Sequence, residues 1–309
     1  MADEYGLVDL ESVEDVGDEW EELDVSDTEA DRIARRRDRE FAEFRKRIKN
    51  SERFKVEASV FDDATFGALY KLVQDGAIAA LGGPISTGKE ANVYTALGGP
   101  VAREILGAAD DPETDDQNHY QNQDPEVAVK VYRISASDFS DMRVYLEGDP
   151  RFEGIGSDKK EVVLAWTRKE FANLKRGRAG GVRLPKPVAV ERNVLVMEYI
   201  GTSEGRAKRL AEVRVENPET AFGVVREYMR RLYDAGLVHG DLSEYNLVFH
   251  EGQIVVIDLG QAVTVHHPNA TDFLERDCYN VAKFFTRQGH PVESDDLMSF
   301  VRDSTSDHD

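Results

Sequence analysis

The sequence predicts an α+β fold of two lobes, in which a strand-rich first half precedes a mostly helical second half. Short apolar runs that suit strands flank the loop at 83–90 and recur at 126–133 and 188–200. A single strong helix pattern, at 157–176, lies among these strands. After residue 217 the clear patterns are helical. We therefore expect a cleft between two lobes, where ligands commonly bind.

Capping residues and turns define the individual elements. A first helix is expected at 62–74, where an aspartate can cap its start and Gly76 can end it. Ser157 or Asp158 can cap the long helix in the same way. The remaining expected elements are paired strands within 188–200 that turn at Arg192 and Asn193, a helix between Pro218 and Gly236, a helix at 272–288 and a short segment around 297–301.

The chain begins with two segments of opposite charge. Residues 1–31 hold 14 acidic side chains and no Lys or Arg, and are expected to form a disordered tail. Residues 32–53 carry a net charge of +6 and have the pattern of a basic helix, which either docks on RNA or simply screens the acidic tail. Further on, we expect a solvated insertion at 107–124, a flexible polar loop at 135–156 and a disordered tail at 303–309.

Composition excludes several classes of protein. The chain has 309 residues, 40% of them hydrophobic, which is enough for a sizeable core. It contains no apolar run of membrane-spanning length and no signal-peptide pattern. A single cysteine, Cys278, excludes an intramolecular disulfide, so we expect a cytoplasmic protein with a buried thiol. The net charge of −21 suits a protein that stays soluble in concentrated salt.

The most informative stretch is LVHGDLSEYNLVFHEGQIVVIDLGQ at 237–261. It places Asp241 five residues before Asn246, and an apolar hairpin then leads to Asp258. An aspartate that accepts a proton from a hydroxyl, with an Asn and an Asp that share Mg²⁺, forms one half of an ATP phosphoryl-transfer site. We therefore predict Asp241 as a catalytic residue and Asn246 and Asp258 as metal ligands, because hard cations prefer oxygen.

The other half of such a site needs a cation held by a helix carboxylate. Lys130 follows three apolar residues in a predicted strand, which is the context expected for a lysine that binds ATP phosphates. Glu170 on the long helix is its expected partner, and Glu161 on the same helix is the rival.

A phosphate-binding loop is also needed, and GPISTGKE at 83–90 is the candidate. It nearly matches a P-loop, but Glu90 stands where a Ser or Thr should meet Mg²⁺. Its backbone N–H groups, the Ser86 hydroxyl and the Lys89 ammonium can still bind phosphate oxygens.

The segments STGKEANVY at 86–94, LVMEYIG at 195–201 and LVHGDLSEYN at 237–246 resemble the RIO family of atypical serine/threonine protein kinases. The first of them is similar to the type-one branch of that family. The resemblance implies a two-lobed protein-kinase-like fold, with an antiparallel-sheet N-lobe and a reduced helical C-lobe that lacks an extended activation segment. The implied boundaries are a kinase domain at 54–302, with the N-lobe at about 54–197, the hinge at 198–201 and the C-lobe at about 202–302.

The resemblance also implies roles for individual residues. Glu198 and Ile200 in the hinge would meet adenine through backbone groups. Asp258 would act as a phosphate acceptor as well as a metal ligand, which would make ATP hydrolysis a second output. ATP and Mg²⁺ are the implied cofactors, with Mn²⁺ as an alternative ion. The implied sites of autophosphorylation, in and beside the loop at 135–156, are Ser135, Ser137, Ser140 and Ser157.

We therefore expect an ATP- and Mg²⁺-dependent serine/threonine protein kinase and ATPase. By resemblance it acts in maturation of the small ribosomal subunit. Its expected partners are a pre-small-subunit particle, rRNA through 32–53, and a protein substrate or itself, with no membrane. One alternative is a small-molecule kinase of the antibiotic type, which shares the HGDLxxxN pattern but not STGKEANVY. The other is a catalytically silent binding module, against which the intact catalytic residues argue.

Overall fold

The structure is a computed structural model that describes residues 61–107, 124–134, 139–152, 154–156 and 158–303. These residues belong to one compact unit, Ser59–Asp309. Outside the described residues lie the charged segments 1–31 and 32–53, most of 107–124 and of 303–309, and three of the serines predicted to be phosphorylated, Ser135, Ser137 and Ser157. In the described part of the chain no helix is long and apolar enough to cross a membrane.

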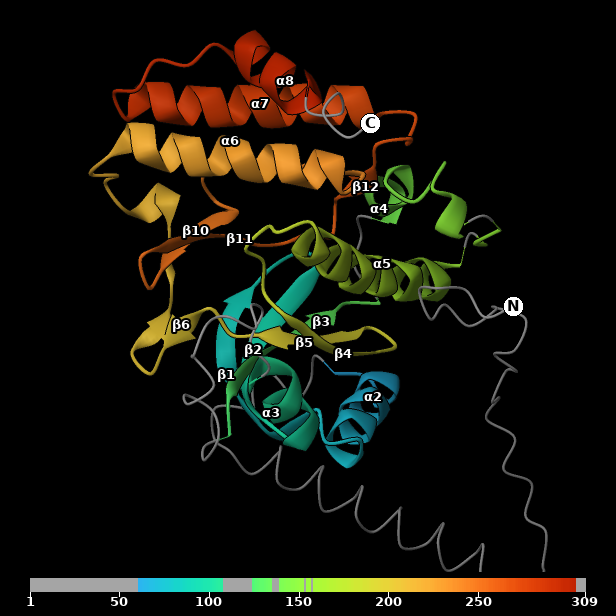
Figure 1. Cartoon of the computed structure of the whole chain (residues 1–309). Helices are drawn as coiled ribbons and strands as arrows, with labels where there is room; N and C mark the ends of the chain where they lie inside the picture. The colour runs from blue at the N-terminus through green and yellow to red at the C-terminus, as the bar shows by residue number, and fades with distance from the viewer. Residues whose placement is uncertain (1–60, 108–123, 135–138, 153, 157, 304–309) are drawn as a thin grey trace, which may run out of the picture. The chain divides into compact units, whose positions relative to one another are not determined.

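An antiparallel sheet of five strands forms the first lobe, in the order β1-β2-β3-β5-β4 (Figure 1). Its strands are β1 (Ile78–Thr87), β2 (Ala91–Gly98), β3 (Glu126–Tyr132), β4 (Pro187–Glu191) and β5 (Val194–Glu198). Strand β3 lies in the middle, and all of its residues after Glu126 are buried. Central burial explains its nearly continuous apolar run, in which Lys130 is the exception. The predicted antiparallel-sheet lobe is confirmed.

Two short helices pack against this sheet. Helix α2 (Asp63–Gln74) agrees with the prediction, and the Asp62 carboxylate caps it by accepting a hydrogen bond from Thr65 N at 2.7 Å. Helix α3 (Pro100–Gly107) was not predicted, and its last residue was assigned to the insertion. Only Ala102 of α3 is buried, while Val101, Ile105 and Leu106 on the same side are half-buried, so its apolar stripe is two turns long and too short to stand out in the sequence. Pro100 at the first position was the available signal.

The prediction of a flexible loop at 135–156 is wrong for most of its length. Helix α4 (Phe139–Val144) and the 3₁₀ turn η2 (Pro150–Phe152) form there. Met142, Leu146 and Phe152 are buried against Trp166 of the following helix. These apolar residues are spaced too irregularly to reveal a helix in the sequence, yet they anchor the segment on a common cluster.

Helix α5 (Lys159–Ala179) confirms the predicted long helix. It begins at Asp158, whose carboxylate accepts a hydrogen bond from Lys160 N at 2.7 Å. Ten of its residues are buried, among them the polar or charged residues Lys169, Glu170 and Asn173. A buried polar side chain must find hydrogen-bond partners, so this face of α5 is built for more than apolar packing.

The second lobe is mainly helical, as predicted. Its helices are α6 (Pro218–Asp234), α7 (Ala270–Arg287) and α8 (Ser294–Arg302). Short strand pairs carry the connecting segments: β9 (Leu237–Val238) with β12 (Val263–Thr264), β6 (Gly201–Thr202) with β7 (Gly205–Arg206), and β10 (Leu247–His250) with β11 (Gln253–Val256) and β8 (Lys208–Arg209). Residues 259–269 are all that separate Asp258 from α7, which confirms the absence of an extended activation segment.

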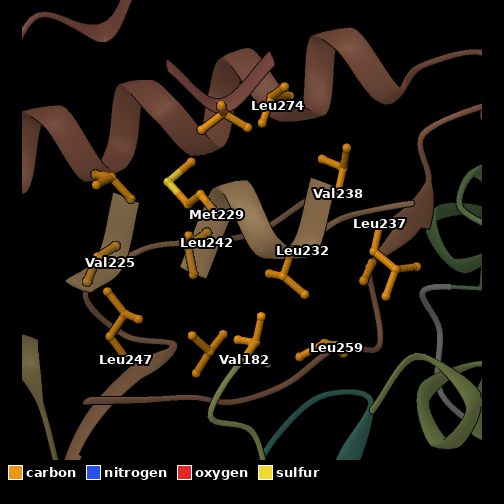
Figure 2. Packing of buried hydrophobic residues seen from close by; sticks show 14 of the residues in the cluster. Val182, Val225, Met229, Leu232, Leu237, Val238, Leu242, Leu247, Leu259 and Leu274 are labelled. Atoms are coloured by element: carbon orange, nitrogen blue, oxygen red, sulfur yellow. The ribbon is translucent and has the colours of Figure 1, made fainter. Parts of the chain in front are cut away.

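The core of this lobe anchors the two loops that carry the predicted catalytic residues (Figure 2). Leu242 and Leu259 lie in one buried cluster, with 1% and 0% of their surface exposed. Each directly follows a predicted site residue, Asp241 or Asp258. Alternate residues therefore point to the core and to the site, which ties the position of each carboxylate to apolar packing.

Candidate active site

Lys130 lies at the centre of the candidate site. Its Nζ donates hydrogen bonds to Glu170 Oε1 at 2.8 Å and to Asp258 Oδ1 at 2.9 Å. The predicted pairing with Glu170 is therefore present, while the rival Glu161 is exposed. Burial alone would lower the pKa of Lys130, but Asp258 and Glu170 together raise it well above its usual value. Lys130 is a permanent cation that joins the two lobes.

Tyr132 orients this ion pair from the same strand. Its hydroxyl donates a hydrogen bond to Glu170 Oε2, so both oxygens of the Glu170 carboxylate are engaged. The Lys130 ammonium also lies 5.0 Å from the centre of the Tyr132 ring. Both residues are almost fully buried, so the pair is shielded from water.

Asp258 has an unusual backbone conformation. Its φ is 64°, in the left-handed region that few non-glycine residues adopt. Its side chain is 51% exposed, so part of the carboxylate stays accessible although Oδ1 accepts a hydrogen bond from Lys130. Desolvation by the surrounding protein raises its pKa, but the Lys130 ammonium outweighs that effect and holds the pKa below its usual value. Asp258 is therefore an ionised carboxylate, and its role as a metal ligand stays a prediction.

Asp241 and Asn246 form a compact pair on the loop between β9 and β10. Asn246 Nδ2 donates to the Asp241 main-chain oxygen at 2.8 Å and to Asp241 Oδ2 at 3.2 Å. Because both amide hydrogens are used, Asn246 Oδ1 is left to accept or to coordinate. Burial and repulsion from Asp258 raise the pKa of Asp241. A raised pKa suits a group that accepts a proton.

The sequence analysis missed Asp277 on α7, which holds this loop in place. Its carboxylate is 1% exposed and accepts hydrogen bonds from Gly240 N and Leu242 N, each at 2.7 Å. These two N–H groups flank Asp241. Arg276 supports the same loop by donating to the Gly240 oxygen. The available signal was an aspartate inside the apolar stripe of a predicted helix.

His239 connects the two catalytic loops. Its Nε2 lies 3.2 Å from the Ile257 oxygen, and its Nδ1 accepts a hydrogen bond from Asp241 N at 3.3 Å. These partners assign the neutral tautomer with hydrogen on Nε2. Burial lowers the pKa of His239 to about 4. The ring is therefore a neutral structural link between the segment before Asp258 and the backbone of Asp241.

The loop predicted to bind phosphate is the hairpin between β1 and β2. Ser86 pairs with Val93 across the hairpin, and Gly88 N donates to the Ala91 oxygen at 2.9 Å. Lys89 is exposed, and among the described residues no hydrogen bond or ion pair joins it or Ser86 to the Lys130 cluster. The loop joins two strands, whereas a P-loop leads from a strand into a helix. Phosphate binding by Ser86 and Lys89 stays a prediction.

The predicted hinge residues follow β5. The Glu198 carboxylate is taken by Arg183, whose Nη1 and Nη2 donate at 2.8 and 2.5 Å, and by Lys186 N at 3.0 Å. Ile200 is buried, and its main-chain oxygen accepts a hydrogen bond from Ala207 N at 2.9 Å. The Glu198 N–H also donates to the Lys186 oxygen at 2.8 Å, which leaves its main-chain oxygen as the group a ligand could meet, and the roles of Glu198 and Ile200 stay predictions.

The donor set of the site suits a hard cation that also binds phosphate. Asp258 offers an exposed carboxylate oxygen and Asn246 an amide oxygen. Within the described residues there is no group of three or more His, Cys, Asp or Glu that could hold a metal ion. Mg²⁺ in phosphoryl-transfer sites takes one or two side-chain oxygens and fills its shell with phosphate and water, so two ligands suffice.

Comparison with known proteins agrees with this geometry. The RIO domain family matches residues 113–297. The chain is 65% identical to the RIO-type serine/threonine-protein kinase Rio1 of Haloferax volcanii, over 97% of this chain and 96% of that protein. It is 38% identical to serine/threonine-protein kinase RIO1 of Saccharomyces cerevisiae, over 75% of this chain and 49% of that protein.

Among solved structures, the fold is similar to that of the Rio2 kinase of Chaetomium thermophilum in its ADP/Mg²⁺-phosphoaspartate complex. The TM-score is 0.55 at 20% identity, over 80% of this chain and 69% of that chain. This likeness shows the fold, while the sequence relatives show the branch. The chain therefore belongs to the RIO family, in its Rio1 branch of serine/threonine protein kinases.

Proposed function

We propose that this kinase uses ATP and Mg²⁺ to phosphorylate serine or threonine, including its own, and also hydrolyses ATP. The observation that carries the proposal is the Lys130 ammonium held between Glu170 and Asp258 at 2.8 and 2.9 Å. Such a lysine pairs with a helix Glu in protein kinases and binds ATP phosphates. Asp241, hydrogen-bonded to Asn246, lies close enough to Asp258 for the two carboxylates to repel each other. These are the parts that phosphoryl transfer requires.

Each side chain has a distinct task in this proposal. When bound, ATP supplies the phosphoryl group and Mg²⁺ neutralises charge on the phosphate oxygens. Asn246 Oδ1 and the Asp258 carboxylate hold the ion. Asp241 orients the attacking hydroxyl and accepts its proton, for which its raised pKa is suited. Lys130 stabilises negative charge that develops on the phosphates.

We further propose that Asp258 is itself a phosphate acceptor. One Asp258 oxygen attacks the γ-phosphorus, the bond from that phosphorus to the β-γ bridging oxygen breaks, and ADP leaves. Water then cleaves the acyl phosphate to inorganic phosphate and restores the carboxylate, so the net reaction is ATP hydrolysis. The exposed Asp258 oxygen supports this step. The phosphoaspartate complex of the related fold gives it a precedent in another protein.

The test uses ATP labelled on the γ-phosphate. Wild-type protein and Asp241→Asn are incubated with Mg²⁺, and protein-bound label is divided into an acid-stable fraction and a fraction released by hydroxylamine. We expect acid-stable label on Ser or Thr, and hydroxylamine-sensitive label that Asp258→Asn abolishes. We expect the acid-stable fraction of Asp241→Asn to fall at least about a hundredfold, the lower range for loss of a general base. Normal labelling of Asp241→Asn would contradict the proposed role.

We propose small ribosomal subunit maturation as the setting, on the basis of the resemblance to the family. The basic segment 32–53, with its net charge of +6, is the part of the chain suited to RNA. Deleting it should weaken association with pre-small-subunit particles and lower the salt dependence of binding. Unchanged association at matched salt would remove rRNA docking from the proposal, while leaving the catalytic assignment intact.

A further inference from the structure

Helix α5 contributes more to the site than Glu170. On the same buried face, Lys169 and Asn173 reach across to the turn that follows Asp258. Lys169 Nζ donates to the Gly260 oxygen at 2.8 Å. Asn173 Nδ2 donates to the Ala262 oxygen at 2.9 Å and to the Leu259 oxygen at 3.3 Å. Three main-chain oxygens of one short turn are thus bound by one helix.

The side-chain oxygen of Asn173 accepts a hydrogen bond from a different part of the chain. Arg151 Nη1 donates to Asn173 Oδ1 at 3.1 Å. The Arg151 guanidinium is held in turn by the buried Asp149 carboxylate, with Nε to Oδ1 at 3.0 Å and Nη2 to Oδ2 at 2.7 Å. Because Arg151 can only donate, Asn173 must turn its oxygen towards it, and both amide hydrogens must then face the turn. Arg151 therefore fixes the orientation of the amide.

The turn needs this support because Asp258 has little packing of its own. Its side chain is 51% exposed and its φ is 64°. Such a backbone conformation is costly for a non-glycine residue and persists only where the surroundings hold it. Lys130 binds one oxygen of the carboxylate at 2.9 Å. The hydrogen bonds from α5 hold the residues that immediately follow.

The hydrogen bond from Lys169 to the turn does not depend on the protonation state of the amine. Burial, with repulsion from Arg151, lowers its pKa to about 7. A neutral amine still has N–H groups, so the hydrogen bond to the Gly260 oxygen is available on either side of that pH. Asn173 differs, because its donors depend on which way Arg151 turns the amide. Asn173 is therefore the link through which a change at 149–152 reaches the turn.

We propose that Asn173, oriented by Arg151, is a positioning residue that sets Asp258 for metal binding, so that the segment 149–152 is coupled to the phosphoryl-transfer site. The inference rests on the proposed role of Asp258 as a metal ligand. It assigns a function to a segment that the sequence suggested was a flexible loop. It also predicts that a substitution that removes the Asn173 donors lowers the affinity for the metal ion, whereas loss of a merely structural hydrogen bond lowers stability alone.

The decisive variant is Asn173→Asp. The carboxylate has the same shape and still accepts from Arg151, but it removes both donors and places an oxygen against two main-chain oxygens. The matched control is Thr167→Val on the same buried face of α5. The Thr167 hydroxyl donates to the Val163 oxygen of its own helix, at 2.8 Å, and within the described part of the chain it makes no hydrogen bond to the turn. Both substitutions remove buried hydrogen bonds from one helix.

The readout is thermal stabilisation by Mg²⁺ in the presence of a non-hydrolysable ATP analogue, which needs no turnover. We expect the Mg²⁺ concentration at half-maximal stabilisation to rise at least about tenfold in Asn173→Asp, equivalent to about 1.4 kcal/mol. It should stay within about twofold of the wild-type value in Thr167→Val. The concentration of analogue needed without Mg²⁺ should be unchanged in both. A wild-type Mg²⁺ midpoint in folded Asn173→Asp would overturn the inference.

A second variant keeps the test decisive if Asn173→Asp does not fold. Arg151→Lys keeps the Asn173 side chain itself, but it cannot reproduce the paired bonds to Asp149 and so weakens the control of the amide orientation. We expect its Mg²⁺ midpoint to rise about threefold, and an unchanged midpoint would contradict the coupling of 149–152 to the site. If the wild-type protein shows no stabilisation by Mg²⁺ at all, the proposed function itself fails, which is a separate outcome.

Discussion

Asp277 gives the sharpest prediction about how this site is built. Its buried carboxylate accepts two hydrogen bonds of 2.7 Å, from Gly240 N and Leu242 N, on either side of Asp241. Asp277→Asn keeps one acceptor but turns an NH₂ group towards the other N–H, leaving a buried donor unpaired at a cost of about 1–3 kcal/mol. Opposing this, burial raises the pKa of Asp277 to about 7, so the wild-type carboxylate carries a desolvation cost that a neutral amide escapes.

We therefore expect a small effect on stability and a large effect on turnover. The free energy of unfolding of Asp277→Asn should fall by about 1 kcal/mol, the low end of that range. Displacement of the loop acts directly on Asp241, so kcat should fall at least about tenfold, or about 1.4 kcal/mol in the barrier. The control is Glu275→Gln, an exposed residue of the same helix, for which both quantities should stay unchanged.

The assay combines urea unfolding followed by circular dichroism at pH 8 with initial rates of γ-phosphate transfer at saturating ATP and Mg²⁺. At this pH the Asp277 carboxylate is mostly ionised, so the comparison is between a charged and a neutral group. If kcat of Asp277→Asn lay within twofold of the wild-type value while the protein remained folded, the two hydrogen bonds would not position Asp241. The reasoning would also fail if Glu275→Gln lost turnover to the same extent.

Three further predictions follow from burial and charge. Burial lowers the pKa of His239 from 6.5 to about 4, so between these pH values the ring takes up a proton on unfolding, and up to about 3 kcal/mol of stability is lost as the pH falls from 6.5 towards 4. The urea midpoint of His239→Asn should therefore fall less over that pH range than the midpoint of the wild type, and equal slopes would contradict this. Cys278 is 0% exposed with its pKa raised by burial to about 12, so a thiol reagent at pH 8 should label it only in denaturant, and rapid labelling of native protein would show the burial to be wrong. With a net charge of −21, the protein should unfold on dialysis from multi-molar KCl to low salt, and equal ellipticity in both would refute adaptation to salt.

The parts of the fold that the sequence predicted have local signals. Helix α2 has its capping Asp62, and α6 begins with Pro218 at its first turn. The apolar strands β4 and β5 lie on either side of the tight turn at Arg192. Asp241, Asn246 and Asp258 were found in the same way, because spacing along one short stretch specifies them. A signal carried by neighbouring residues is visible without any knowledge of tertiary contacts.

The parts that were missed depend on contacts between distant segments. Helix α3 has an apolar stripe of only two turns, of which Ala102 alone is fully buried. The segment at 139–152 looks polar in the sequence, and only the structure shows that its few apolar residues pack in the cluster around Trp166. Asp277 is 37 residues from Gly240, to which it is bonded. Asn173 is 89 residues from Ala262. The spacing of apolar residues along the sequence carries no information about hydrogen bonds between residues so far apart in the chain.

These missed residues explain how a kinase with so short a segment after Asp258 can hold a complete site. Only residues 259–269 connect Asp258 to α7, so there is no long loop whose ordering could position the predicted metal ligand. Asn173 and Asp277 instead bind the main chain beside Asp258 and Asp241 from the two helices that flank the loops. Both are buried and both use two hydrogen bonds to backbone groups. Backbone groups are present whatever the loop side chains are, so this support is in place before any ligand binds. We therefore expect changes in α5, in α7 or in the segment at 149–152 to alter the geometry of the site, because these segments hold the backbone of both loops.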